Sequence, residues 1–229
     1  MGNTEKKAKR KYTHEEKMLV IPKSTFSRLP IYYCYLQGKI NDGVEFISSS
    51  LIASDLSLNA VQVRKDLASV STVPGRPKRG FRTAKLLSDM KTYLGYDNYD
   101  EAVLVGVGGL GSTLLQYPGF GNYGLDIVAG FDANPTLHGK TIGGKNILPM
   151  EKFADFVNRL KINIGIVAVP PPQAQEIADL MIASGIKAIW NFAPAHITIP
   201  RGVLIKNENL AASLAALSKE LTRNLNKEK

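Results

Sequence analysis

The segment VLVGVGGLGSTLLQY (residues 103–117) decides the fold of the second half of this chain. It joins a short apolar run, VLV, through a glycine-rich stretch to apolar residues with helical spacing. The glycines fit the pattern G-x-G-x-x-G, which forms a phosphate-binding turn when it follows a strand and opens a helix. Both conditions are met, so the segment predicts a strand, a loop and a helix that hold a dinucleotide.

Three glycines of this loop have different expected roles. Gly106 makes the tight turn, Gly108 lets the backbone approach a pyrophosphate, and Gly111 lets the helix pack closely on the strand. The helix N-terminus offers free N–H groups and a positive dipole end to phosphates. The predicted cofactor contacts of the loop are Gly106, Val107, Gly108, Gly109, Leu110 and Gly111. The alternative is a glycine-rich turn that binds no ligand.

A carboxylate follows the next predicted strand, LDIVAGF (residues 125–131). Asp132 stands there, 21 residues after Gly111, where it can accept hydrogen bonds from both ribose hydroxyls of an adenosine. The same charge would repel the 2′-phosphate of NADP. No basic cluster comes after Asp132, so the predicted cofactor is NAD(H).

Five apolar runs alternate with helical patterns in the second half of the chain, at 101–105, 125–131, 162–169, 188–193 and 202–206. This alternation indicates a parallel sheet covered on both faces. Ligands bind such sheets at the carboxyl ends of the strands, and two loops are expected there. One contains Val169 and Pro170, and the other contains Ala193 and Pro194. These four residues complete the candidate cofactor contacts, although the prolines fit equally well as simple strand ends and helix starts.

The first part of the chain has the pattern of a DNA-binding unit. A helix is expected from Ser24 to a stop at Gly38, and two short helices at 51–56 and 60–70 are joined by a polar turn, as in a helix-turn-helix. Asn59 is expected to cap the second helix, with Gln62 reaching back as in a capping box. The segment TVPGRPKRGFRT (72–83) predicts a hairpin or wing, and another helix is expected at 84–95.

Positive charge is concentrated in this part. Residues 1–90 contain 16 Lys and Arg against 8 Asp and Glu, whereas the rest contains 13 against 12. Such asymmetry suggests a polyanionic partner. The candidate DNA contacts are Gln62, Arg64, Lys65, Arg76, Lys78, Arg79 and Arg82. The alternative is an ordinary helix pair with solvated charges.

Other features narrow the class of protein. Cys34 is the single cysteine and the histidines number three, which argues against disulfides and metal catalysis. No apolar run approaches a membrane span, and the basic segment 1–22 lacks the apolar core of a secretory signal. We therefore expect a flexible basic tail at 1–22 and a cytoplasmic protein. At the other end, leucines along 209–225 form an apolar stripe that should pack against a partner subunit.

The order of these parts resembles the Rex family of bacterial redox-sensing transcriptional repressors. The resemblance runs from about Ser24 to Leu221. It is carried by the motifs RLPIYY (28–33), QVRKDL (62–67), GF (80–81), GVGGLG (106–111), FD (131–132) and NFAPA (191–195).

The resemblance implies an α/β Rossmann domain (91–207) preceded by an α+β winged-helix domain (23–90). It also implies a C-terminal helix (208–229) that is swapped between the subunits of a homodimer. Operator DNA with an inverted repeat would be the partner, with NADH lowering the DNA affinity and NAD+ opposing it. Tyr117 matches a family tyrosine near the nicotinamide, although a tyrosine packed on the sheet at a helix end fits equally well.

The chain departs from the family at a contact that acts as a switch. The family has an acidic residue at the start of the last helix, which can engage the first-helix arginine, here Arg28, across the dimer. This chain has Asn209 there, with Glu208 before it.

Two alternatives to a repressor are an NAD-dependent oxidoreductase and a Rossmann protein for another nucleotide, such as coenzyme A. An enzyme is disfavoured because His196 is the best acid–base candidate and no substrate domain accompanies it.

Overall fold

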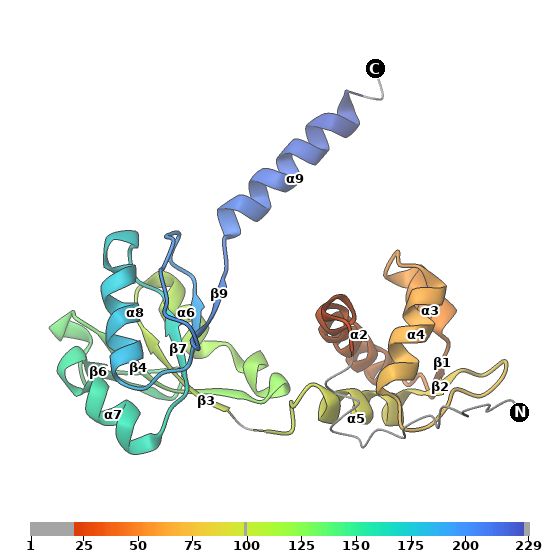
Figure 1. Cartoon of the computed structure of the whole chain (residues 1–229), viewed down its shortest axis with the longest axis horizontal. Helices are drawn as coiled ribbons and strands as arrows, with labels where there is room; N and C mark the ends of the chain where they lie inside the picture. Colours follow the sequence, from red (N-terminus) through yellow and green to blue (C-terminus); the bar gives the residue numbers. More distant parts are fainter. Residues whose placement is uncertain (1–20, 99, 227–229) are drawn as a thin grey trace, which may run out of the picture. The chain divides into compact units, whose positions relative to one another are not determined.

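The computed structural model describes residues 21–98 and 100–226, and it divides into two compact units at Asp97 and Asn98 (Figure 1). The expected boundary at 90/91 falls inside helix α5 (Thr83–Tyr93). This helix belongs wholly to the first unit, because it packs on α2 and buries Leu86 and Met90. Residues 1–20 of the expected tail lie outside the described residues.

The first unit has the predicted helix pair and a wing. Ser48 accepts a hydrogen bond from the Leu51 amide at the start of α3, and Asn59 caps α4. Strands β1 and β2 pair in antiparallel fashion, and the loop before β2 forms the wing. The elements before α5 are α2 (Lys23–Asn41), β1 (Phe46–Ile47), α3 (Ser49–Asp55), α4 (Ala60–Val70) and β2 (Phe81–Arg82).

Two local predictions for this unit are wrong. Helix α2 starts after Pro22 rather than at a Ser24 cap, runs through Gly38 and ends at Asn41. Its stop is Gly43, whose φ of +76° is the left-handed conformation found after helix ends. The second error concerns Gln62, whose side chain donates to Asp66 rather than closing a capping box.

The second unit is built on a seven-stranded sheet in the order β5-β6-β4-β3-β7-β8-β9. All neighbours are parallel except β5, which is antiparallel to β6 at the edge. The strands are β3 (Asp100–Val105), β4 (Leu125–Asp132), β5 (Thr141–Ile142), β6 (Lys145–Pro149), β7 (Ile164–Val167), β8 (Ala188–Asn191) and β9 (Leu204–Asn207). The sequence predicted five of these and missed β5 and β6.

Helices cover both faces of the sheet. Side chains alternate along β3, so that Val103 and Val105 pack under α7 and α8, whereas Leu104 packs under α6. The covering segments are α6 (Gly109–Gln116), α7 (Phe153–Leu160), α8 (Ala174–Ala183) and the short 3₁₀ turns η1 (Pro118–Tyr123), η2 (Pro135–Leu137), η3 (Met150–Lys152) and η4 (Pro171–Gln173). This arrangement is the doubly wound α/β fold that the sequence predicted.

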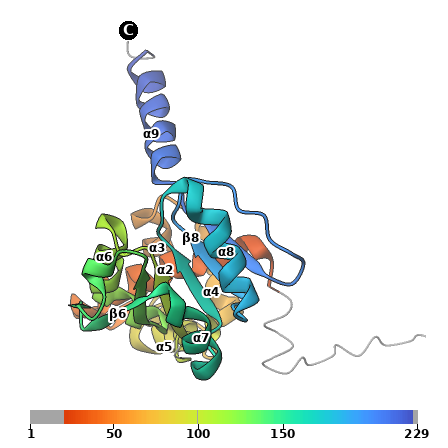
Figure 2. The same ribbon diagram turned by 90° about the vertical axis from the view of Figure 1, so that its left-hand side faces the viewer.

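The last helix, α9 (Leu210–Leu225), extends away from the sheet (Figures 1 and 2). Every residue from 211 to 226 is exposed, including four leucines of the apolar stripe, among which Leu214 is 67% and Leu217 is 63% exposed. An amphipathic helix with a solvent-exposed apolar stripe lacks the packing that normally stabilises such a helix. In the described part of the chain, no helix combines the length and apolarity needed to cross a bilayer.

Candidate functional site: a dinucleotide loop and a DNA-binding face

The three glycines of the loop after β3 have the predicted geometry. Gly106 has φ of +97°, and a Cβ there would lie 2.6 Å from the carbonyl oxygen of Ala168. A Cβ on Gly111 would overlap the carbonyl oxygen of Gly106. In contrast, a Cβ on Gly108 would meet no atom within 4 Å. The backbone is therefore tight at both ends of the loop and open at Gly108, where a pyrophosphate would approach.

The start of α6 provides N–H groups for an anion. The first backbone hydrogen bond of the helix joins the Ser112 amide to the Gly108 carbonyl over 2.9 Å. The N–H groups of Gly109, Leu110 and Gly111 precede this bond, so they are not satisfied within the helix. The Val107 amide is already used, because it donates to Asp132. Among the described residues, no hydrogen bond uses these N–H groups, which lie at the positive end of the α6 dipole.

Asp132 ends β4 beside this loop. Its Oδ2 accepts from the Val107 amide over 2.7 Å, and its Oδ1 accepts from the Asn134 amide over 2.8 Å. The carbonyl oxygen of Asp132 accepts from Nε2 of His138, also over 2.8 Å. The carboxylate is thus held in one orientation, and each oxygen keeps a lone pair that a ribose hydroxyl can use.

The two further predicted loops lie at the same edge of the sheet. The strand order reverses between β3 and β7, and ligands bind at such a switch point. The contact between Gly106 and Ala168 places the Val169–Pro170 loop directly beside the glycine loop. Ala193 and Pro194 follow β8, one strand farther, where the buried Asn191 accepts from the Ala193 amide over 2.9 Å.

Tyr117 lies apart from the glycine loop. It follows α6, and eight helical residues place it about 12 Å from Gly109. Its side chain is 54% exposed and contacts Phe120 edge-on, with ring centroids 4.9 Å apart. The ring contacts continue from Phe120 to Trp190 and from Trp190 to Phe192, which follows β8 at the ligand edge. The sequence analysis missed this aromatic row, because its members come from separate elements.

In the first unit, the predicted DNA-contacting residues of α4 face solvent. Gln62, Arg64 and Lys65 are all exposed. Arg64 lines a groove of about 650 Å³ between α4, the start of α3 and the wing. Within the described residues, neither Arg64 nor Lys65 has a hydrogen bond or ion pair through its side chain, whereas Gln62 donates to Asp66 over 2.8 Å. These two cations are therefore available for an anionic partner.

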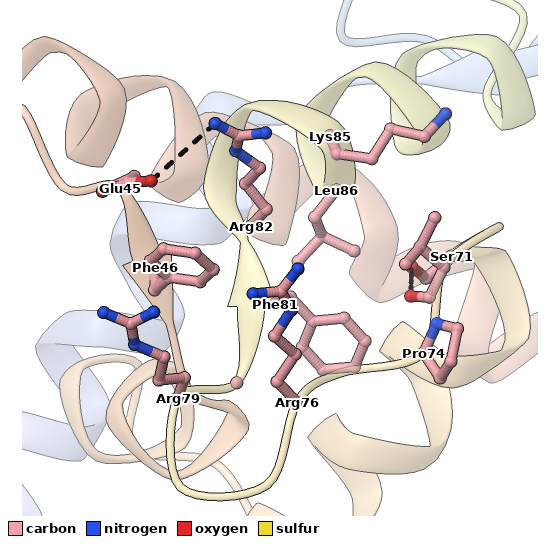
Figure 3. A pocket seen from close by; sticks show the side chains of 12 residues that line it. Glu45, Phe46, Ser71, Pro74, Arg76, Arg79, Phe81, Arg82, Lys85 and Leu86 are labelled. Carbon is pink, nitrogen blue, oxygen red and sulfur yellow. Dashed lines mark hydrogen bonds and ion pairs between the residues drawn. The ribbon is translucent and has the colours of Figure 1, made fainter.

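The wing carries Arg76, Lys78 and Arg79, and Arg82 follows in β2. Arg76 and Gly80 exchange backbone hydrogen bonds of 2.7 and 2.9 Å, which closes a turn with Lys78 at its tip. A second cavity, of about 560 Å³, lies between the wing, β1 and α5 (Figure 3). Arg76, Arg79 and Arg82 line it, and Arg82 lies 3.8 Å from Glu45. The positive charge of Arg82 is thus partly offset, unlike that of Arg79.

The three candidate switch residues have partners within their own units. Arg28 pairs with the buried Asp66. The Asn209 side chain caps α9 by accepting from the Ala212 amide over 2.8 Å. Glu208 accepts from Nε1 of Trp190 over 3.1 Å. The sequence analysis missed Asp66, Trp190 and the capping role of Asn209.

Comparisons with known proteins follow the division into two units. Residues 20–68 match the family "Putative DNA-binding protein N-terminus", and residues 97–195 match the family "CoA binding domain". The redox-sensing transcriptional repressor Rex of Porphyromonas gingivalis is 42% identical over 197 residues, which cover 86% of this chain and 90% of the relative. The chain belongs to the Rex family.

A second Rex repressor, from Bacteroides fragilis, is 37% identical over 89% of this chain and 92% of its own length. Among solved structures, the Rex-family repressor RSP is 32% identical, with a TM-score of 0.79 over 91% of this chain and 98% of RSP. RSP has also been solved with β-NADH (TM-score 0.81) and with β-NAD+ and operator DNA (TM-score 0.80). The winged-helix and Rossmann architecture is thus shared with Rex repressors.

Proposed function

We propose that this Rex-family protein is a transcriptional repressor that binds operator DNA and leaves it when NADH binds. The observation that carries the proposal is the presence of two sites in one chain. The first unit exposes cations on α4 and the wing, and the second has an open phosphate loop beside a fixed carboxylate. In a protein with both sites, the cytoplasmic NADH/NAD+ ratio can control DNA binding.

The DNA-bound form is proposed to be a homodimer that reads an inverted repeat. Each chain offers one α4 helix, and a two-fold dimer presents two of them to two half-sites. The exposed leucine stripe of α9 supports association, because burial in a partner would remove its apolar surface from water. Residues 208–229 are therefore proposed as the dimerisation element, swapped between subunits.

NAD(H) fits the second site better than NADP or coenzyme A. Asp132 presents a fixed carboxylate where the adenosine ribose would lie. NADP carries a phosphate on the ribose 2′ oxygen and coenzyme A carries one on the 3′ oxygen, so either would place like charges together. The match to the family "CoA binding domain" covers residues 97–195, which include both the glycine loop and Asp132.

The two sites are proposed to be linked by reciprocal coupling. If NADH binds better to the dimer that does not hold DNA, DNA weakens NADH binding by the same factor that NADH weakens DNA binding. A hundredfold effect needs about 2.7 kcal/mol of coupling free energy. NADH and NAD+ differ at the nicotinamide, so residues near that ring must discriminate between them, and Asp132 should hold both forms alike. Tyr117 and its aromatic row are the proposed discriminating residues.

Neither histidine of the described residues supports the oxidoreductase alternative. The side chain of His138 is engaged with the Asp132 carbonyl, and His196 is exposed beyond β8. We therefore propose that the protein is not an enzyme.

A DNA-binding titration at several NADH/NAD+ ratios tests the function. The probe is a labelled duplex enriched by the protein itself from a random-sequence pool, with a scrambled duplex of equal length as the control. The expected result is tight binding with NAD+ and release as the NADH fraction rises. Equal affinity at all ratios would overturn the redox-sensing role. Consumption of NADH with simple ketones or 2-oxo acids would favour the oxidoreductase instead.

A further inference from the structure

One aromatic side chain of β1 supports two arginines of the wing. The guanidinium carbon of Arg79 lies 4.9 Å from the ring centroid of Phe46, and that of Arg76 lies at 6.0 Å (Figure 3). Both distances are within the range of cation–π attraction, and Arg79 has the closer contact. Phe46 belongs to neither the recognition helix nor the wing, so no motif in the sequence marked it.

The wing cations differ in how they are held. Arg82 faces Glu45, and Lys85 of α5 pairs with Asp89 over 2.7 Å. Arg79 has no hydrogen bond or ion pair through its side chain within the described residues. The ring therefore restricts the position of Arg79 without neutralising its charge or using its hydrogen-bond donors. Lys78, at the tip of the turn with φ of +63°, is also exposed, and no aromatic ring of the described residues contacts it.

We propose that Phe46 is a positioning residue for the DNA contact of the wing. It holds the Arg79 guanidinium at the mouth of the wing cavity, so that less side-chain freedom is lost when Arg79 binds a backbone phosphate of DNA. The proposal rests on the proposed DNA-binding function, and it makes β1 part of the DNA-binding surface.

A double-mutant cycle in the full-length protein tests this role. Phe46→Leu keeps an apolar side chain but removes the aromatic face, and it should weaken binding of the enriched duplex about two- to fivefold. Arg79→Ala should then cost less in the Phe46→Leu background than in the parent, by a similar factor. Lys78→Ala, the matched control, should cost the same in both backgrounds. Phe46→Tyr, which keeps the aromatic face, should preserve the full cost of Arg79→Ala.

The outcomes separate this proposal from the proposed function. Equal costs of Arg79→Ala in the parent and Phe46→Leu backgrounds would overturn the role of Phe46, while DNA binding by the parent stands. Equal loss of the Arg79 and Lys78 contributions in the Phe46→Leu background would indicate a misfolded wing and would also overturn it. A parent that binds neither the enriched nor the scrambled duplex would overturn the proposed function itself, and this inference with it.

Discussion

Arg28 and Asp66 form a forked ion pair that joins α2 to the recognition helix α4. Nε and one terminal nitrogen of Arg28 donate to the two carboxylate oxygens of Asp66, over 2.8 and 3.0 Å. Asp66 is 1% exposed and also accepts from the side chains of Thr25, Tyr32 and Gln62. A buried carboxylate with four side-chain donors fixes the helix that carries Arg64, and it links the arginine of the expected switch to the DNA-binding face.

Replacing Asp66 should loosen the first unit. Asp66→Asn removes the charge that Arg28 and three other donors share, at an expected cost of about 1.5–3 kcal/mol in the stability of that unit. Hydrogen exchange of the α2 and α4 amides measures this cost, with Asp42→Asn, at an exposed position just after α2, as the control. The single tryptophan, Trp190, lies in the second unit, so its fluorescence should stay unchanged. Equal exchange in both variants would contradict the role of Asp66.

The same pair predicts a dependence on pH. Burial acts to raise the pKa of Asp66, but hydrogen bonds from Arg28, Gln62, Tyr32 and Thr25 outweigh it and hold the pKa below its usual range. A carboxyl whose pKa is lower in the folded state contributes stability above its unfolded pKa of about 3.9. This contribution is lost as pH falls from there through the folded pKa. In that acidic window the first unit of the parent should lose stability more steeply than Asp66→Asn, and parallel curves would contradict this.

The sequence predicted the architecture because its helix-capping residues and helix-ending glycines indicated the same element boundaries as the hydrophobic pattern. Asn59 before α4 and Gly95 after α5 have the capping and left-handed conformations that their residue types favour. Where two signals competed, tertiary packing decided between them. Gly38 and Gly43 both suit a helix end, and the helix continues to the second. Strand β6 was missed because KNILP (145–149) is short, contains two polar residues and gains its strand conformation only by pairing with β4.

The candidate site was predictable at the backbone and less so at the side chains. The roles of Gly106, Gly108 and Gly111 follow from local geometry, so the motif sufficed to predict them. The partners of Arg28 and Gln62 depend on the buried Asp66, which lies 38 residues from Arg28. A helical carboxylate facing the core resembles an ordinary surface position in a sequence, and only the packing of α2 against α4 reveals it.

Two alanine substitutions in the glycine loop should separate cofactor binding from stability: Gly108→Ala should affect binding, and Gly111→Ala should affect stability. Gly108→Ala places a methyl group in open space, so the protein should fold as the parent does. That methyl group then stands where the pyrophosphate approaches, and NADH should bind about 5- to 100-fold more weakly. Gly111→Ala forces a methyl group into the Gly106 carbonyl, so it should lower the unfolding temperature of the second unit. Fluorescence titration with NADH and thermal unfolding test both, and unchanged NADH affinity in Gly108→Ala would contradict the loop assignment.

Asp132 should set the preference among dinucleotides. Asp132→Ala removes hydrogen bonds to the ribose and the charge that repels a 2′-phosphate, so NADH and NAD+ should weaken together while NADPH and NADP+ gain relative to them. It also frees the Val107 and Asn134 amides. Asp132→Asn is the matched control, because it keeps the size and one acceptor but loses the charge. Titration with all four dinucleotides measures the preference, and unchanged ratios in both variants would disprove the assignment.

The last prediction concerns the departure of this chain at the start of α9. Asn209 caps α9, and aspartate caps helices equally well, so Asn209→Asp should leave the helix intact. Glu208→Gln keeps an acceptor for the Trp190 indole and loses only the charge, which lies 3.9 Å from Lys206. Neither variant should disturb the fold of the second unit, so each isolates the effect of one charge on the switch.

The effect of these charges depends on which hydrogen-bond donors of Arg28 Asp66 leaves unused. Asp66 uses Nε and one terminal nitrogen, so the other terminal nitrogen and a 24% exposed side chain remain for a residue of the proposed partner subunit. A neutral contact from Asn209 would contribute about 0.5–1.5 kcal/mol, and the charged contact in Asn209→Asp about 1.5–3. Asn209→Asp should therefore shift the NADH concentration at which DNA is half released, by stabilising the dimer state that contains the contact. Glu208→Gln should shift it only if Glu208 has taken over this role. Midpoints equal to the parent in both variants would mean that NADH acts on DNA affinity without the Arg28 contact, through packing of the two units.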